Sequence, residues 1–225
     1  MRLVTWNVQH GQDMAARLAS LRARFSPDVL AMQEPPAAAL GATLAWEGGK
    51  PEGKGVAFDS LLPCQRVLVP GPSSPAIAAR ITASPLGPFN ALAVWAQKTD
   101  GGYRGDVLRT LDQYDAFLRE QPAVILGDFN LDARIKGRGR EDFEAVRRRL
   151  EDGLGCCSAY HALTGEAFGQ EQAATLYFRR AADAPFHCDF IWIPSAWRPR
   201  LQSVQVPGFA DDLGSDHRPV VCEMA

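Results

Sequence analysis

The stretch from Ala123 to Asn130, Ala-Val-Ile-Leu-Gly-Asp-Phe-Asn, decides the fold. Its first four residues form a continuous apolar run bounded by a glycine, which is typical of a fully buried strand. The polar residues of Gly127-Asp128-Phe129-Asn130 follow directly, where that strand ends. Open α/β sheets place their sites at such strand ends, so this stretch predicts an α/β protein with a polar site at a sheet edge.

The N-terminal segment predicts a second strand that ends in a polar side chain. Successive side chains of a strand point to opposite faces, so in residues 2–7 Trp6 is expected to point into the core. Asn7 then stands at the end of the strand. Asp13 is expected to cap a following helix, whose apolar residues recur with helical spacing as far as Phe25.

A third strand closes this first unit. Pro27 ends the helix, and residues 28–32 form a buried strand that runs into Gln33-Glu34. Residues 35–54 are rich in Pro, Gly and Ala, which favours loop and irregular structure.

The rest of the chain mixes short strands with two more amphipathic helices. The spacing of the strands between residues 56 and 96 favours hairpins over βαβ crossovers. Strand signals lie at 56–58, 66–69, 77–81, 91–96, 175–178, 190–193 and 218–222, and helix signals at 107–118 and 143–150. This mixture predicts an α/β (α+β) protein in which helices cover stacked sheets, within one domain of residues 1–225.

Composition excludes several classes of protein. The 225 residues hold 24 Lys plus Arg against 26 Asp plus Glu, a net charge of −2, with 46% hydrophobic and 22% charged residues. These values exclude disordered, collagen-like and strongly basic coat proteins, and leave a local basic face possible. Five cysteines without CxxC spacing encode neither a disulfide framework nor an obvious zinc site. With no signal peptide or membrane-spanning run, a soluble, cytoplasmic monomer is expected.

Five polar clusters stand at or near the ends of predicted strands, and their order carries more information than any one of them. They are Trp6-Asn7, Gln33-Glu34, Gly127-Asp128-Phe129-Asn130, Asp189, and Ser215-Asp216-His217. The order Asn, Glu, Asp-x-Asn, Asp, Asp-His resembles that of the endonuclease/exonuclease/phosphatase family, in particular its small bacterial members related to exonuclease III and AP endonucleases. The resemblance runs from residue 3 to residue 222.

This resemblance implies a fold and a reaction. The fold is a four-layer sandwich, with two mixed β-sheets packed face to face and helices outside. The site lies where the carboxyl ends of strands from both sheets converge. The reaction is metal-dependent hydrolysis of a phosphodiester, and the leading interpretation is a nuclease acting on DNA. A phosphatase or phosphodiesterase for a nucleotide, phosphoinositide or phospholipid head group is the alternative, and a phosphate-binding module without catalysis is a third.

The chemistry of the clusters agrees with this reaction. An attacking hydroxide is repelled by an anionic phosphodiester unless charge is neutralised, and Glu34, helped by Asp216 and Asn7, offers oxygen ligands for Mg²⁺ or Mn²⁺. Asp128 is the candidate to orient or deprotonate water, with Asn130 holding water or phosphate on the same side if the strand's pleat continues.

The Asp-His cluster would act on the phosphate. His217 can bind its developing negative charge, and Asp189 is placed by analogy to accept the other ring hydrogen and favour the imidazolium. Family members with a second catalytic histidine carry it where this chain has Trp95, so a two-histidine mechanism is not expected. Tyr103 and Arg104 are the nearest equivalents of the tyrosine and basic residue that exonuclease III-type members place near the phosphate.

Other features have two interpretations. Seven cations between residues 134 and 149, Arg138 among them, follow the Gly-Asp-x-Asn turn and either track a nucleic-acid backbone or form a solvated helix face. The site residues also have alternative roles: capping or turn chemistry for Asp128, Asn130, Glu34, Asp216 and His217, a structural turn for Asn7, and a surface strand position for Asp189. The remaining histidines are not expected to act in the reaction. His10 is expected in a loop or behind the ligands, and His161 is expected to have a structural role or to line the rim of the site. His187 is expected on the exposed face of its strand. The pair Cys156-Cys157 is expected to pack in the core.

Overall fold

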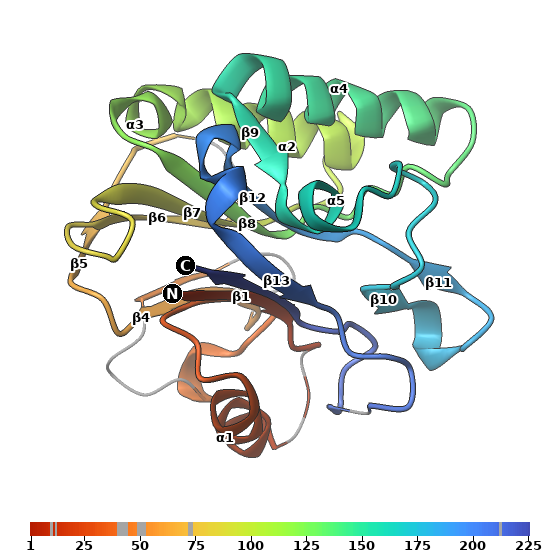
Figure 1. Cartoon of the computed structure of the whole chain (residues 1–225). Helices are drawn as coiled ribbons and strands as arrows, with labels where there is room; N and C mark the ends of the chain where they lie inside the picture. The colour runs from red at the N-terminus through yellow and green to blue at the C-terminus, as the bar shows by residue number, and fades with distance from the viewer. Residues whose placement is uncertain (10, 12, 40–44, 49–52, 72–73, 212) are drawn as a thin grey trace.

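The computed structural model describes the chain except for residues 10, 12, 40–44, 49–52, 72–73 and 212. Two six-stranded sheets lie face to face, and a two-stranded hairpin projects from one end (Figure 1). The first sheet has the order β13-β14-β1-β2-β4-β3 and the second β5-β6-β7-β8-β12-β9. Within each sheet one strand pair is parallel, β1 with β2 and β7 with β8, so both sheets are mixed as expected.

The elements have the following bounds. The strands are β1 Arg2–Asn7, β2 Val29–Gln33, β3 Ala45–Gly48, β4 Gly55–Ser60, β5 Cys64–Val67, β6 Ala76–Ile81, β7 Phe89–Trp95, β8 Ala123–Asp128, β9 Cys156–Ser158, β10 Leu176–Tyr177, β11 Pro185–Phe186, β12 Asp189–Pro194, β13 Leu201–Gln205 and β14 Val220–Met224. The α-helices are α1 Met14–Phe25, α2 Gly102–Gln113, α3 Asp115–Glu120, α4 Arg138–Leu154 and α5 Ala159–Thr164. The 3₁₀ turns are η1 Ala37–Ala39, η2 Phe178–Arg180 and η3 Ser195–Arg200.

Apolar side chains join these elements into four layers. The largest buried cluster lies between the sheets, where Leu3 and Val29 of one sheet meet Val124 and Ile191 of the other. A second cluster packs α2, α3 and α4 onto the outer face of the second sheet, and a third packs α1 onto the outer face of the first. Figure 1 shows the resulting sandwich, with α2, α3 and α4 above and α1 below. The expected four-layer fold is therefore confirmed.

Several local expectations needed correction. Asp13 stands at the N-cap of α1 in a left-handed conformation (φ 61°), and its side chain makes no capping hydrogen bond. The segment expected to be loop contains β3, which pairs with β4. The helix expected at 107–118 is divided at Tyr114 into α2 and α3. Near 175–178 only Leu176–Tyr177 is a strand.

The hairpin expectation held for part of the chain. Strands β5, β6 and β7 form consecutive antiparallel pairs. Between β4 and β5, however, the chain passes from the first sheet to the second, and β7 joins β8 in parallel through the crossover made by α2 and α3. Strand β4 therefore belongs with β2 and β3, a choice that depends on packing of the two sheets and not on local spacing.

Strand direction also corrects the expected placement of the site. Asn7, Glu34 and Asp128 do stand at the carboxyl ends of β1, β2 and β8. Asp189 begins β12 and His217 precedes β14, and these strands run antiparallel to β8 and β1. The amino ends of two strands therefore meet the carboxyl ends of three others at one edge of the sandwich.

Candidate active site

Asp128 is fixed by the last residues of β8. Gly127 adopts φ 151°, and a Cβ there would lie 2.0 Å from the carbonyl oxygen of Val94 on the neighbouring strand. Only glycine allows the two strands to approach this closely. In the antiparallel register Asp128 stands directly opposite Asp189 of β12. The two carboxylates therefore project from adjacent strands at the same level.

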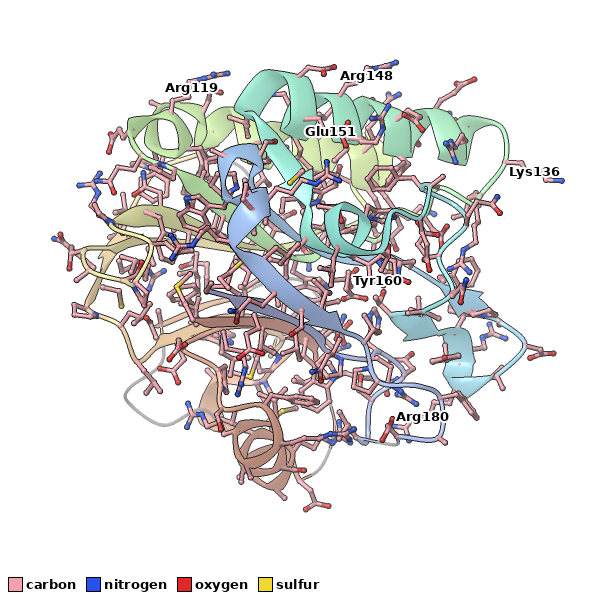
Figure 2. All side chains as sticks on the ribbon, viewed as in Figure 1. Arg119, Lys136, Arg148, Glu151, Tyr160 and Arg180 are labelled. Atoms are coloured by element: carbon pink, nitrogen blue, oxygen red, sulfur yellow. The ribbon has the colours of Figure 1, made fainter. Side chains whose placement is uncertain are left out.

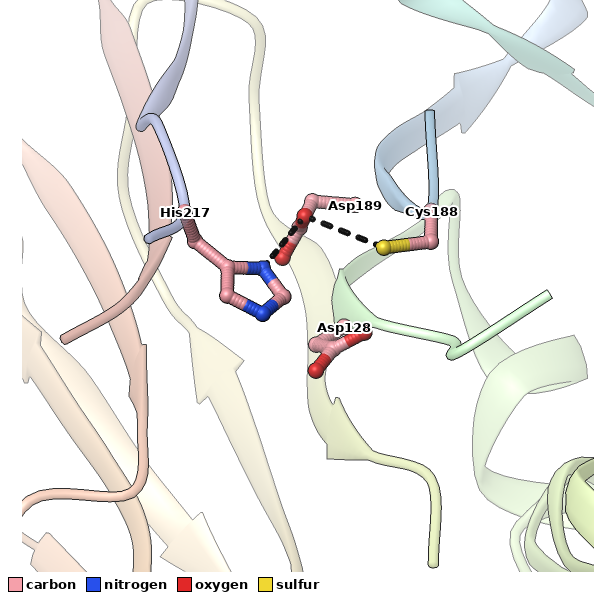
Figure 3. Close-up of side chains that lie close together, drawn as sticks. All are labelled: Asp128, Cys188, Asp189 and His217. Atoms are coloured by element: carbon pink, nitrogen blue, oxygen red, sulfur yellow. Dashed lines mark hydrogen bonds and ion pairs between the residues drawn. The ribbon is translucent and has the colours of Figure 1, made fainter. Parts of the chain in front are cut away.

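Asp189 and His217 form the hydrogen bond that the sequence predicted. His217 Nδ1 lies 2.9 Å from Asp189 Oδ2, and both side chains are buried (Figure 3). Thr175 holds the aspartate in place, since its Oγ1 accepts the backbone N–H groups of Cys188 and Asp189, each at 3.0 Å. Thr175 is thus a positioning residue, whose role nothing in its own sequence neighbourhood indicated.

The turn that carries His217 is tied to β1. Ser215 Oγ donates to the carbonyl of Asn7 at 2.8 Å and accepts the backbone N–H of His217 at 3.1 Å. Trp6 lies in the core as expected, and its indole N–H donates to the carbonyl of His217 at 3.2 Å. The ends of the chain are therefore joined at the site, more than 200 residues apart in sequence.

Two asparagines position the carboxylates. Asn7 Nδ2 donates to Asp128 Oδ2 at 3.0 Å and to Glu34 Oε1 at 3.3 Å, which connects the two sheets. Asn130 Nδ2 donates to the same Asp128 oxygen at 3.0 Å and to the carbonyl of Ala96 at 3.0 Å. Asn130 has φ 51°, so the chain turns tightly here and the strand's pleat does not continue. The turn, and not the pleat, brings Asn130 beside Asp128.

Burial and neighbouring charges shift the protonation of this cluster. Burial, followed by the charge of Asp189, raises the pKa of Asp128 to about 7. Burial alone would lower the pKa of His217, but the charge and hydrogen bond of Asp189 outweigh burial and raise the pKa to about 10. Near neutral pH the cluster thus combines an imidazolium with a carboxyl group close to its own pKa.

Glu34 and Asp216 form a more accessible group at the mouth of the site. Glu34 lies at the end of β2 with φ 68°, a strained conformation for this residue. Its Oε2 accepts from Lys54 Nζ at 2.5 Å, and the two side chains are 18% and 25% exposed. The charge of Glu34 acts on Asp216, whose pKa is raised mainly by burial. Sequence reasoning missed Lys54, because it lies 20 residues from Glu34 in a segment with no strand or helix pattern.

One group of potential metal ligands differs from the predicted one. Among the described residues, the donor atoms of Asp128, Cys188, Asp189 and His217 all lie within 4.8 Å of one another. Figure 3 shows the four side chains converging from three segments of the chain. Cys188 Sγ lies 3.6 Å from Asp189 Oδ2. Asn7 connects this mixed donor set to the carboxylate of Glu34, and Asp216 directly precedes His217.

The other predicted site residues take different positions. Tyr103 is half-buried near the cluster, and burial followed by the charge of Asp128 raises its pKa. Arg104 forms an ion pair with Asp142 of α4 at 3.0 Å, which joins α2 to α4. Arg138 is exposed at the start of α4. Trp95 is buried between the sheets.

The basic segment is largely occupied with structural contacts. Arg134 pairs with the buried Asp132, Arg140 and Arg147 share Glu144, and Arg149 pairs with Asp115. These four arginines therefore support the loop and α4. Lys136 and Arg148 point into solvent, as Figure 2 shows, and with Arg138 they are the remaining cations of the seven.

The remaining histidines and cysteines are mostly structural. His161 is buried between Ser158 Oγ at 2.8 Å and Glu171 Oε1 at 3.0 Å. His187 is also buried, at 1% exposure, so the expectation of an exposed strand face was wrong: its ring contacts the aromatic rings of Tyr160 and Phe190. His10 lies outside the described residues. Cys156 packs in the apolar cluster on the outer face of the second sheet, and Cys157 packs against the cluster between the sheets.

A second cationic surface lies on the hairpin of β10 and β11. Between these strands Phe178, Arg179 and Arg180 are exposed, and Arg179 Cζ lies over the ring of Phe178, 5.2 Å from its centroid. The hairpin is anchored to the site because the backbone N–H of Tyr177 donates to the carbonyl of Asp216 at 2.8 Å. A small cavity of about 190 Å³, lined by Asn130, Leu176, Phe178, Phe186, Cys188 and neighbouring side chains, separates the hairpin from the buried cluster.

The two facing mixed sheets and the Asp–His cluster at their edge define a DNase I-like α/β protein. The sequence model of the Endonuclease/Exonuclease/phosphatase family matches residues 4–217, and the chain belongs to this family. It is accordingly a hydrolase of the nuclease and phosphatase type. A search of curated proteins found no match.

Solved structures share the fold. The chain is similar to the 3′ phosphatase NExo from Neisseria bound to a product DNA hairpin, with 20% identity, a TM-score of 0.75, and coverage of 100% of this chain and 99% of that one. It is similar to an AP endonuclease from Archaeoglobus fulgidus, with 17% identity, a TM-score of 0.75 and the same coverage. Within the described residues, no helix has the length and apolarity needed to span a membrane.

Proposed function

We propose that this protein is a Mg²⁺- or Mn²⁺-dependent phosphodiesterase that acts on DNA. The observation that carries the proposal is the buried arrangement in which Asp189 holds His217 beside Asp128. A protonated imidazole and an adjacent carboxylate form a pair suited to stabilise a phosphoryl anion and to accept a proton from water. Family membership and the resemblance to DNA-bound NExo support the choice of substrate.

The residues at the mouth of the site fit a hard divalent cation. Glu34 and Asp216 supply carboxylate oxygens, and Asn7 Oδ1, which already accepts the backbone N–H of Gln9, keeps a second lone pair for a cation. Glu34 already balances its charge with the ammonium of Lys54, so this position accommodates a positive group. When bound, the metal ion would polarise the phosphoryl oxygen and stabilise the leaving oxygen.

The chain's own side chains would divide the remaining work. Asp128 would orient the attacking water and take its proton, a role suited to a pKa of about 7. Asn7 and Asn130 keep its carboxylate in one orientation through their amide groups. His217 would donate its Nε2–H to a phosphate oxygen, while Asp189 holds Nδ1 and preserves the positive charge. Tyr103, half-buried at the same edge, would donate its hydroxyl to the phosphate.

The hairpin of β10 and β11 supports a polymeric substrate. Its exposed aromatic ring and Arg179 offer stacking and phosphate contacts, the combination that nucleic-acid surfaces use. Arg180 adds positive charge beside them, although its guanidinium also donates to Gln9 Oε1 and to the carbonyl of Gly214. Lys136, exposed before α4, and Arg138, exposed at its first residue, would extend this surface. The Arg104 side chain would first have to break its ion pair with Asp142.

Parallel substrate assays test the proposal. The protein is incubated with Mg²⁺ and supercoiled DNA, an abasic-site duplex, a 3′-phosphorylated oligonucleotide or bis-p-nitrophenyl phosphate, each with and without EDTA. We expect cleavage of at least one DNA substrate at low enzyme concentration and complete loss in EDTA. The Asp128→Asn protein is the control for contaminating nuclease. Turnover of only the small ester would favour the alternative, a phosphodiesterase for a small substrate.

Two outcomes would overturn the proposal. Full activity in EDTA would exclude the metal dependence, and binding of DNA without hydrolysis of any ester would favour the phosphate-binding module. A single catalytic domain of residues 1–225, the monomeric state and the cytoplasmic location stay predictions, which size-exclusion chromatography and fractionation of cells can test.

A further inference from the structure

Cys188 gives the buried cluster a ligand type that the proposed reaction does not use. The thiol lies 3.6 Å from Asp189 Oδ2, and the donor atoms of Cys188, Asp128, Asp189 and His217 all lie within 4.8 Å of one another. Hard cations such as Mg²⁺ prefer oxygen, whereas thiolate and imidazole together favour Zn²⁺ and its soft relatives. The donor set is therefore wrong for the proposed cofactor and right for a thiophilic metal.

A second observation points to a ligand in this cluster. Asp189 is fully buried, and its Oδ1 has no hydrogen-bond partner, although Oδ2 accepts from His217. An unsatisfied buried carboxylate oxygen costs free energy, and a cation bound among these side chains would satisfy it.

Cys188 lies at the wall of a cavity next to the hairpin. Cys188 is itself only 3% exposed, but it lines the cavity of about 190 Å³ between the buried cluster and the hairpin. Burial and the neighbouring carboxylates raise the pKa of the thiol well above its usual range, so it stays protonated in the metal-free protein. A thiophilic ion can displace this proton, and Mg²⁺ has little affinity for the sulfur.

We propose that Cys188, Asp128, His217 and Asp189 form a second cation site that is selective for thiophilic divalent metals such as Zn²⁺ and Cd²⁺, and that its occupation blocks hydrolysis. As the metal–sulfur bond forms, the thiol proton passes to the buffer, and His217 releases its Nε2 proton while Nδ1–H stays bonded to Asp189. No electron is transferred. The inhibitory part rests on the proposed function, since it removes Asp128 and His217 from that reaction, but the binding part does not.

Cd²⁺ titration tests the binding part without any substrate. The full chain carrying Cys64→Ser, which removes the exposed cysteine, is freed of metal and titrated with Cd²⁺ in excess Mg²⁺. We expect one Cd²⁺ per chain and the ultraviolet charge-transfer band of a Cd²⁺–thiolate bond. Cys188→Ser should abolish the band, whereas Cys156→Ser, which removes another buried thiol, should keep it. A band that persists in Cys188→Ser, or no band in the parent protein, overturns the proposal.

Two further measurements complete the test. If Cys188→Ser fails to fold, Asp128→Asn and His217→Gln serve instead, and each should weaken Cd²⁺ binding by about tenfold or more, as loss of a ligand does. Unchanged affinity in both would overturn the assignment. Micromolar Zn²⁺ should inhibit hydrolysis in the parent protein despite excess Mg²⁺, and Cys188→Ser should resist it. A protein that hydrolyses nothing can still show the Cd²⁺ band, so failure of the proposed function remains distinguishable.

Discussion

The floor of the site and its cationic rim are built on opposite principles. On the floor, Asp128, Asp189 and His217 are at most 6% exposed and hold one another through hydrogen bonds from rigid strand ends. On the rim, Arg179 and Arg180 stand on an exposed hairpin. Buried charges interact strongly and are hard to replace, whereas exposed ones are screened by salt. The floor should therefore act on every phosphoester and the rim on long substrates alone.

The rim itself divides into two unlike regions. Arginines of the segment 134–149 mostly pair with carboxylates of the same segment or of nearby helices, whereas Arg179 stacks over an exposed ring. The presence of an arginine in the sequence therefore does not show that its guanidinium is available to a ligand. A carboxylate paired with a guanidinium offsets much of its attraction for a phosphate and occupies some of its N–H donors.

The largest effect is expected on the floor. Asp128→Asn keeps the shape of the side chain but removes the proton acceptor, so kcat should fall by about 10³-fold or more on DNA and on a small phosphodiester alike. Steady-state kinetics on both substrates, with circular dichroism to confirm folding, measure this. A loss confined to DNA would break the distinction between floor and rim.

Asp189→Asn should have the next largest effect. Loss of the carboxylate charge lowers the pKa of His217 and so destabilises its protonated form. We therefore expect kcat to drop by about 10²-fold with little change in KM. Because Asp189 acts through His217, the double variant Asp189→Asn/His217→Ala should lose no more than His217→Ala alone. Losses that add in free energy would show that the two residues act independently.

A rim variant should affect one substrate only. Arg179→Ala/Arg180→Ala should raise KM for DNA by about tenfold and reduce the slope of log KM against log salt by ~1–2, as loss of phosphate contacts does. Turnover of bis-p-nitrophenyl phosphate should not change. The matched control, Arg134→Ala/Arg140→Ala, removes ion-paired arginines and should lower the melting temperature more than it raises KM. Equal increases in KM from both double variants would show that the ion-paired arginines and those of the hairpin contribute equally to DNA binding.

Lys54→Met tests the boundary between floor and rim. The ammonium balances Glu34 in the metal-free protein, so its removal should strengthen Mn²⁺ binding about fivefold, which corresponds to the ~1 kcal/mol of a partly exposed ion pair. Electron paramagnetic resonance of free Mn²⁺ measures the affinity directly. Weaker Mn²⁺ binding in Lys54→Met would instead show that the lysine supports the metal site.

The last prediction concerns stability and pH. His217 has a pKa of about 10 when folded and about 6.5 when unfolded, so its stabilising contribution is complete below about pH 6.5 and is lost as pH rises through about 10. In EDTA, the wild type should therefore have a higher melting temperature than His217→Gln at low pH, and this difference should shrink between pH 6.5 and 10. Each ~1 kcal/mol of unfolding free energy that is lost corresponds to a decrease of about 2–4 °C in the melting temperature. Calorimetry at several pH values measures it, and an advantage that grows with pH would contradict the assignment.

Some of the site could be anticipated from sequence because local chemistry is enough to indicate it. The apolar run before Asp128 predicts a buried strand, and Gly127 is explained only by the close approach to Val94. The pairing of Asp189 with His217 was predicted through the order of motifs and is present in the structure. Lys54 and Thr175 were missed because each acts through a partner brought near by folding.

The sequence by itself determined the strand–helix alternation of the first unit, the amphipathic helices, the polar strand ends and the family. Periodicity and short motifs are local properties, so a single chain records them directly. Only the tertiary structure decided that β4 joins the first sheet and β5 the second, that His187 is buried, and that Cys188 lies beside Asp128, Asp189 and His217. These facts depend on which surfaces pack together, and packing between distant segments leaves no pattern in either segment alone.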